Sequence, residues 1–165
     1  MMLKRSVALC VITAAVTAMV LGPSAAHAYG FSGAGGKLGY ASPENLDGTA
    51  SVSVHAEFEK PDSRLHLLPN LGYLNVDRVS DVNPNMDVYY HFVREGKVTP
   101  YVGGGVGLNF VHRQRIDDSS TDLGMNLMGG LRFPGQSNHV FVEGRYTASD
   151  ISQVSLLTGI TFHSR

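Results

Sequence analysis

The sequence predicts an all-β protein, an eight-stranded antiparallel up-and-down transmembrane β-barrel preceded by a cleaved signal peptide. Three observations carry this prediction. The N-terminal segment has the charge and apolar pattern of an export signal. The remainder divides into eight alternating segments separated by turn-forming residues. The polar face of these segments carries ionised side chains in mid-strand, whereas the apolar face carries mostly aliphatic and aromatic ones.

Residues 1–28 are predicted to form the signal peptide. Lys4 and Arg5 precede an apolar run over residues 7–21, and the segment closes on the small-residue triplet Ala-His-Ala. The apolar run is shorter than the roughly 20 residues that a membrane-spanning helix needs. We therefore expect cleavage after Ala28, which leaves residues 29–165 as one barrel domain.

The composition of residues 29–165 excludes several classes of protein. The only cysteine, Cys10, lies in the predicted signal peptide, so no disulfide stabilises the mature chain. The whole chain has 13 basic and 14 acidic residues, and removal of Lys4 and Arg5 makes the remainder more acidic. A surface of this charge is not suited to nucleic acid, because affinity for the phosphate backbone depends on clustered basic residues.

Turn-forming runs divide the mature segment, namely SPENLDG, EKPDSR, RVSDVNPN, REGK, RQRIDDSS, PGQSN and TASD. They separate eight expected strands at approximately residues 29–41, 48–58, 65–77, 85–93, 98–112, 121–133, 138–146 and 152–162. Most of these segments have the length of a tilted strand that crosses a bilayer. An even number of strands is what a closed antiparallel barrel with both ends on one side requires.

Apolar and polar residues alternate in most segments, which gives each strand one apolar and one polar face. In residues 48–58, for example, Val52 and Val54 lie on one face and His55 lies on the other. Residues 65–77 are less regular, because the phase slips near Tyr73-Leu74, as a β-bulge would explain.

Five ionisable residues lie in mid-strand on the polar face: Glu57, His91, Arg132, Glu143 and Arg145. A lipid-facing exterior explains why the opposite face is almost purely apolar, so the polar face is expected to line the lumen. We expect the five side chains to pair as a structural cluster that fixes strand register. The alternative interpretation is a polar pathway for ions or small solutes, but eight strands leave no aqueous channel.

The segment TPYVGGGVGLNFVHR places three glycines on the predicted lumen face: Gly103, Gly105 and Gly107. Glycine weakens a strand interior, so a run of this kind needs a reason. An eight-stranded barrel is barely wide enough for its own side chains. We expect the three glycines to make room for long lumen side chains such as Arg132, Glu143 and Arg145.

Four phenylalanines close the second, fourth, sixth and eighth segments on the apolar face: Phe58, Phe92, Phe133 and Phe162. If both termini are periplasmic, the even-numbered strands end at the periplasmic turns. The four rings are then at one height and point outward, which predicts the periplasmic half of an interfacial aromatic girdle.

The order of the eight segments, with PYVGGGVGLNF, VFVEGRY and a final segment ending LLTGITF, resembles the small outer-membrane β-barrel family of the OmpA/OmpX type. The resemblance covers essentially all of the mature chain. It implies a barrel in the outer membrane of a diderm bacterium, folded with the help of the barrel-assembly machinery. In one respect the sequence departs from the family, whose last strand usually ends on an aromatic residue: His163, Ser164 and Arg165 follow Phe162 here.

Two stretches resemble binding motifs but lack necessary residues. GAGGKLG is not a phosphate-binding loop, because Phe31 stands where the first glycine belongs and Leu38 follows Lys37 in place of Ser or Thr. DVNPNMD resembles the start of a calcium loop, with oxygen-bearing residues at alternate positions: Asp81, Asn83, Asn85 and Asp87. Met86 occupies the required glycine position, so an ordinary polar turn is expected.

Neither a zinc site nor an active site is predicted. The histidines of the mature chain, at positions 55, 66, 91, 112, 139 and 163, show no paired spacing typical of zinc ligands. Barrels that modify lipids use a serine beside a histidine. Ser149 has no histidine near it in the sequence, and His163 and Ser164 are adjacent only at the C-terminus.

We therefore expect a monomeric, non-enzymatic outer-membrane barrel without a cofactor. Its expected role is envelope integrity or surface interaction through its loops, and its expected partners are outer-membrane lipids and lipopolysaccharide. Two alternatives remain open: a narrow channel or transport barrel for small solutes, and a lipid-modifying enzyme. Fold alone does not decide among these functions.

Overall fold

The computed structural model describes residues 29–44, 47–76, 79–92, 98–113 and 118–164. The predicted signal peptide, residues 1–28, lies outside the described residues. Within the described parts, no helix is long and apolar enough to cross a membrane.

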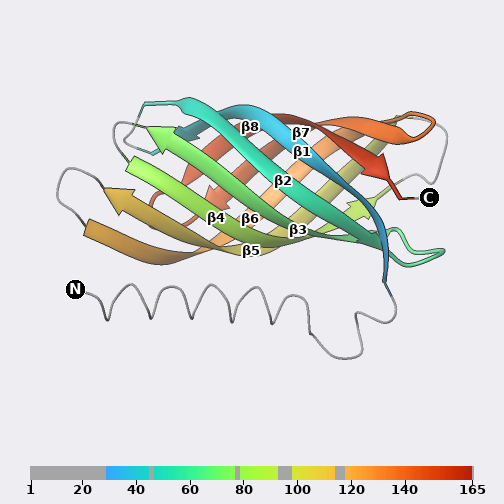
Figure 1. Ribbon diagram of the computed structural model, residues 1–165, viewed down its shortest axis with the longest axis horizontal. Coiled ribbons are helices and arrows are strands. Elements are labelled where there is room, and N and C mark those ends of the chain that lie inside the picture. Colours follow the sequence, from blue (N-terminus) through green and yellow to red (C-terminus); the bar gives the residue numbers. More distant parts are fainter. Residues whose placement is uncertain (1–28, 45–46, 77–78, 93–97, 114–117, 165) are drawn as a thin grey trace.

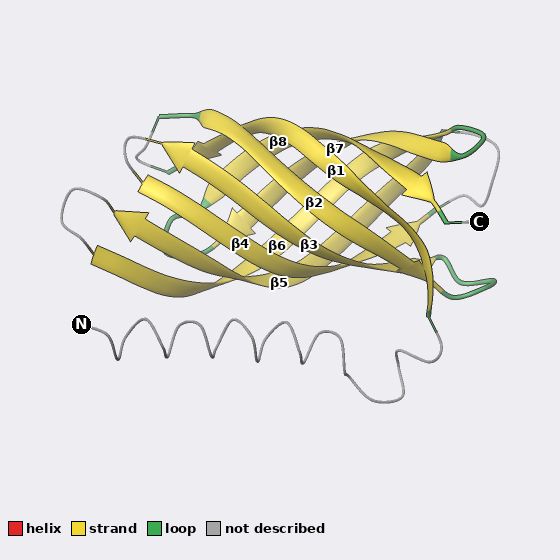
Figure 2. Ribbon diagram, in the orientation of Figure 1, coloured by secondary structure: helices red, strands yellow, loops and turns green. Residues whose placement is uncertain are grey.

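Eight antiparallel strands form a closed barrel in which each strand pairs with its neighbours in sequence (Figures 1 and 2). The strands are β1 (Gly30–Pro43), β2 (Thr49–Glu59), β3 (Leu65–Val76), β4 (Val79–His91), β5 (Thr99–Arg113), β6 (Asp118–Pro134), β7 (Asn138–Ala148) and β8 (Gln153–His163). The first and last strands close the barrel, with Gly33 opposite His163 and Pro43 opposite Gln153. The predicted fold class is confirmed in its strand number, pairing and closure.

Strands β4 and β6 are longer than the sequence predicts. The run RVSDVNPN, expected to be a turn, is mostly strand, because β4 already begins at Val79. Similarly, β6 begins at Asp118, inside the expected turn RQRIDDSS. The prediction was wrong here because Asn and Asp favour turns when their side chains bond to the local backbone. In β4, Asn85 does make such a local bond, to the carbonyl of Asn83, but Asn83 and Asn85 also bond to Asn109 of β5 and Asn70 of β3, which keeps the segment in the sheet.

Strand β3 has a continuous register with β4 from Leu65 to Val76, so the bulge expected near Tyr73 is absent. The alternation is regular in space: Leu74 faces inward at 5% exposure, and Tyr73 faces outward at 45%. The phase looked irregular because β3 places the apolar Leu68 and Leu74 inside a mostly polar lumen. The register shift occurs in β1, between Phe31 and Gly33.

The barrel wall separates two environments. In β7 buried and exposed residues alternate without interruption, with Glu143 and Arg145 inside and Val142 and Tyr146 outside. This strict period of two is the geometry of a pleated strand with different surroundings on its two faces. The lumen is therefore filled by side chains from all eight strands, and the outer wall is apolar.

Candidate functional site

A cluster of charged and phenolic side chains fills the middle of the lumen. This central charged cluster consists of Lys37, Asp87, Tyr89, Tyr101, Glu143 and Arg145, contributed by β1, β4, β5 and β7. Each member is at most 8% exposed. Burial of a charge is costly unless it is paired and hydrogen-bonded, so these side chains need partners within the cluster.

Glu143 is the hub of the cluster. Its Oε1 accepts hydrogen bonds from Lys37 Nζ at 3.3 Å and from Arg145 Nε and Nη2 at 3.1 and 3.0 Å. Its Oε2 accepts hydrogen bonds from the hydroxyls of Tyr89 at 2.6 Å and Tyr101 at 3.0 Å. Both carboxylate oxygens of a fully buried residue are thus satisfied by four other side chains.

Arg145 links Glu143 to a second buried carboxylate. Its Nη2 donates to Asp87 Oδ2 at 2.7 Å, and Asn70 Nδ2 donates to the same oxygen at 2.7 Å. The formal charges of Lys37, Arg145, Asp87 and Glu143 cancel. Balanced pairs with fully used hydrogen-bonding capacity are the form in which buried ions are tolerated.

The five predicted lumen residues all lie on the inner face but form two groups. Glu143 and Arg145 belong to the central cluster. Glu57, His91 and Arg132 lie towards the end of the barrel where β1 begins and β8 ends, which we call the terminal mouth. The predicted set omits Lys37, because the glycines around it obscure the phase of β1. Period-two counting from Gly33 to Gly39 places Lys37 on the inner face with them.

The three predicted lumen glycines make room for residues of β4 rather than for Arg132, Glu143 and Arg145. In the register of β4 with β5, Gly103, Gly105 and Gly107 lie opposite Tyr89, Asp87 and Asn85, respectively. A Cβ on Gly105 would collide with Asp87 Oδ1, and one on Gly107 would collide with Asn85 Oδ1. The glycines therefore give space to the nearest cross-strand neighbours, because Cβ atoms of opposed residues are closest.

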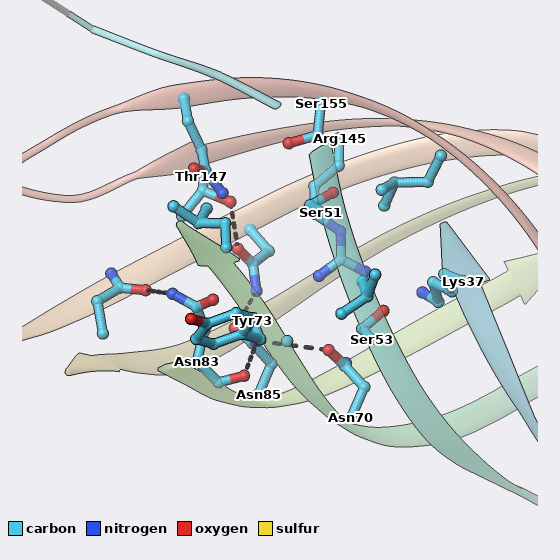
Figure 3. Close-up of a pocket in the computed structure, with 17 residues that line it drawn as sticks. Lys37, Ser51, Ser53, Asn70, Tyr73, Asn83, Asn85, Arg145, Thr147 and Ser155 are labelled. Atoms are coloured by element: carbon cyan, nitrogen blue, oxygen red, sulfur yellow. Dashed lines mark hydrogen bonds between the residues drawn. The ribbon is translucent and has the colours of Figure 1, made fainter. Parts of the chain in front are cut away.

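Towards the opposite mouth the lumen contains a network of asparagine side chains, which also donate hydrogen bonds to Asp81 and Asp87. Asn83 Nδ2 donates to Asn109 Oδ1 at 2.8 Å, and Asn126 Nδ2 donates to Asn85 Oδ1 at 2.8 Å. A cavity of about 50 Å³ lies among these amides, and Figure 3 shows Lys37 and Arg145 with Asn83 and Asn85 in its lining. This volume is large enough for a few water molecules at most.

At the terminal mouth, Glu57 lies among cationic and aromatic neighbours. Arg132 Nη1 lies 3.2 Å from Glu57 Oε1, and His66 Nδ1 lies 2.7 Å from the same oxygen. The His66 ring packs edge-on against the His91 ring, with centroids 4.2 Å apart.

A second cavity at the terminal mouth has a volume of only about 10 Å³. It is lined by Tyr89 and Tyr101 of the central cluster, so this cluster separates the two cavities.

The four predicted girdle phenylalanines lie on the outer face around the terminal mouth, at or next to the ends of β2, β4, β6 and β8. Phe92, Phe133 and Phe162 are exposed, and Phe58 is half-buried. Phe31 of β1 adds a fifth ring, which packs edge-on against Phe58 with centroids 5.7 Å apart. An outward aromatic band thus surrounds the end of the barrel that also carries the histidines.

Solved structures of small eight-stranded outer-membrane barrels have this fold. Neisserial surface protein A (NspA) superposes with a TM-score of 0.66 at 14% identity, over 81% of this chain and 96% of that chain. The N-terminal β-barrel domain of Pseudomonas aeruginosa OprF superposes with a TM-score of 0.60 at 14% identity, over 80% and 97%. Ail, the attachment invasion locus protein of Yersinia pestis, superposes with a TM-score of 0.51 at 11% identity, over 81% and 97%.

At such low identities these similarities establish the fold. No protein-family model matches the sequence, and no curated protein matches it.

Proposed function

We propose that this eight-stranded barrel spans the outer membrane, is exported by the signal peptide at residues 1–28, and supports envelope integrity or surface interaction without catalysis. One observation carries the proposal: large apolar side chains cover the outer wall. Leu123, Met125, Leu127, Val154 and Leu156 are each more than 60% exposed, and most other outward positions are also apolar.

Such a wall is not expected in water, because soluble monomers rarely expose contiguous apolar patches larger than a few hundred Å². An apolar outer wall of this kind is compatible with the hydrocarbon core of a membrane. A closed barrel satisfies its backbone hydrogen bonds between strands, so only side chains meet the lipid. Closure also removes free strand edges, which supports a monomer surrounded by outer-membrane lipids and lipopolysaccharide.

The aromatic band gives the proposed orientation. Aromatic side chains of membrane barrels gather at the two interfaces. Phe58, Phe92, Phe133 and Phe162 would mark the periplasmic interface, because both ends of the barrel domain lie at the terminal mouth. The barrel-assembly machinery is then the proposed partner during insertion, as the family resemblance of the sequence implies.

A surface role is favoured over transport by the filling of the lumen. The central charged cluster separates a cavity of about 50 Å³ from one of about 10 Å³. An ion crossing the barrel would have to displace side chains that hold one another by several hydrogen bonds. We therefore expect no single-channel conductance in planar lipid bilayers, and a steady conductance would contradict a closed lumen.

Two barrels of similar fold are named a surface protein and an attachment protein, which agrees with a surface role.

Catalysis is disfavoured by the serine geometry. Ser149 Oγ donates to the carbonyl of Ile151 at 2.9 Å, and His139 Nδ1 lies 3.2 Å from another histidine, His163. A serine nucleophile needs a histidine within hydrogen-bonding reach. Overexpression should therefore leave the lipid A and phospholipid species unchanged in mass spectra, and a new species would support the enzymatic alternative.

The membrane placement is tested by fractionation together with a lysine scan. The wild-type chain should partition with the outer membrane and change gel mobility on boiling. Leu127→Lys, on the outer wall, should weaken the folded state in lipid by about 2–4 kcal/mol. Ser137→Lys, in the exposed turn between β6 and β7, is the matched control and should have little effect. Recovery of the wild type in a soluble fraction, or equal tolerance of both lysines, would refute the proposal.

A further inference from the structure

The terminal mouth gathers side chains that bind metal ions in other proteins. Two glutamates and four histidines converge there from five strands: Glu57 and Glu59 (β2), His66 (β3), His91 (β4), His139 (β7) and His163 (β8). The spacing of the histidines along the chain does not suggest such a site. The closed barrel brings them together because β2, β4 and β8 end where β3 and β7 begin.

Glu57, Glu59 and His66 have the geometry closest to a ligand set. One ligand atom from each lies within 4.8 Å of the other two. His66 Nδ1 is 2.7 Å from Glu57 Oε1 and 3.6 Å from Glu59 Oε2. Tetrahedral zinc with bonds of 2.0–2.1 Å requires ligand atoms about 3.3 Å apart. The two observed separations lie on either side of this value, so small side-chain rotations would complete the set.

A second observation points to a missing ligand at Glu57, on the carboxylate oxygen that does not contact His66. Glu57 Oε2 is buried and accepts no hydrogen bond from the described residues. His139 Nε2 lies 3.6 Å from it, which is beyond hydrogen-bonding distance. Buried carboxylate oxygens are rarely left unsatisfied, and an unseen ion or water is a recognised explanation.

The local charge and access also suit a cation. Glu57 and Glu59 each carry a negative charge, whereas Arg132 contributes one positive charge beside them. The carboxylates therefore outnumber the arginine that neutralises them. Arg132 bonds to Glu57 Oε1, and a hydrogen bond of this kind orients a ligating carboxylate. The Glu59 side chain is 47% exposed, so an ion can enter from the mouth.

We propose that the terminal mouth binds one divalent first-row transition-metal ion of the zinc type, with Glu57, Glu59 and His66 as its protein ligands. The ion takes the place of the proton between Glu57 Oε1 and His66 Nδ1: a protonated ring releases that proton to water, whereas a neutral ring keeps its one proton on Nε2, and water completes the coordination. Imidazole and carboxylate ligands together suit zinc better than calcium or magnesium, which prefer oxygen ligands alone. The site is independent of the surface role proposed above.

The test uses the purified, folded chain in detergent micelles, stripped with a chelator, and titrated with ZnCl₂ by calorimetry and with CoCl₂ by visible absorption. We expect one ion per chain and the strong visible bands of tetrahedral Co²⁺. Glu59→Gln and His66→Gln should each weaken binding about tenfold or more, since loss of only an outer partner of a metal ligand already costs about 10–100-fold in affinity. Glu59 lies at the exposed rim, so its substitution is not expected to impair folding.

His112→Gln is the matched control, since β5 carries His112 at the opposite end of the barrel. It should bind Zn²⁺ as the wild type does, and the boiling-dependent gel shift should show that every variant is folded. Three results would overturn the assignment: no binding heat and no Co²⁺ bands, equal binding by wild type and His66→Gln, or loss of binding in His163→Gln but not in Glu59→Gln. The last would place the ion at the His139–His163 pair instead.

Discussion

The middle of the lumen and its terminal mouth both bury carboxylates, but they satisfy them to different degrees. In the middle, Glu143 accepts five hydrogen bonds from four side chains, and both of its oxygens are used. At the mouth, Glu57 is equally buried, yet only its Oε1 has hydrogen-bonding partners and its Oε2 has none.

This difference separates a stabilising arrangement from one with spare binding capacity. A charge whose hydrogen bonds are complete can gain nothing from a ligand, so the central charged cluster locks the strands and closes the lumen. A buried carboxylate oxygen without a partner can still gain a ligand. We therefore expect the middle to dominate stability and the mouth to respond to ions, and the following predictions measure that contrast.

The largest effect is expected from Glu143→Gln. The substitution keeps the shape of the side chain but leaves Lys37 and Arg145 with Asp87 as the only remaining carboxylate of the cluster. Breaking a buried ion pair from one side costs about 3–5 kcal/mol. Urea unfolding in lipid vesicles, followed by gel mobility, should show a loss of this size. A loss below about 1 kcal/mol would mean that the cluster does not hold the barrel together.

A smaller but well-controlled effect is expected from Gly105→Ala. Its new Cβ would collide with Asp87 Oδ1 and with the Met86 carbonyl, so the cluster must shift, at a cost of about 1–3 kcal/mol. Gly104→Ala is the matched control, because its Cβ would point outward and meet only Asn126 O, at 3.6 Å. The same unfolding measurement should separate the two variants, and equal losses would show that the inward glycines are not required for space.

At the mouth, Glu57→Gln should cost less than Glu143→Gln. It weakens the two hydrogen bonds that Glu57 accepts from His66 and Arg132, each worth about 1.5–3 kcal/mol when the carboxylate is charged, but it also removes the unsatisfied charge on Oε2. Arg132, its main cationic partner, is 15% exposed and can turn towards water. Unfolding in the presence of a chelator should therefore show a net loss near 1 kcal/mol. A loss as large as that of Glu143→Gln would mean that the mouth is locked as firmly as the middle.

The smallest effect is expected from His163→Gln. His163 is exposed at the end of β8, and surface substitutions usually change stability by less than about 0.5 kcal/mol. A marked loss of stability in the same assay would show that the His139–His163 contact holds β7 and β8 together.

The inner and outer faces could be predicted where the alternation is clean. In β7 the apolar Val142 lies on the outer face and the charged Glu143 lies on the inner face. Their placement therefore follows from the period of two in the strand. In β1 and β3 the prediction failed, because Gly33 and Gly35 carry no polarity signal and Leu68 is apolar on the inner face. Leu68 packs there with Tyr89, Tyr101, Met128 and Phe141 in a buried apolar layer, which no pattern within β3 can reveal.

By itself, the sequence determined the number of strands, their antiparallel order and the polar character of the lumen. These depend on local period and turn chemistry, which act between neighbouring residues. Only the tertiary structure decided which charges meet, because Lys37 and Glu143 are 106 residues apart and their contact depends on closure of the barrel. The same closure brings Glu57, His66 and His139 to the terminal mouth, although they belong to β2, β3 and β7.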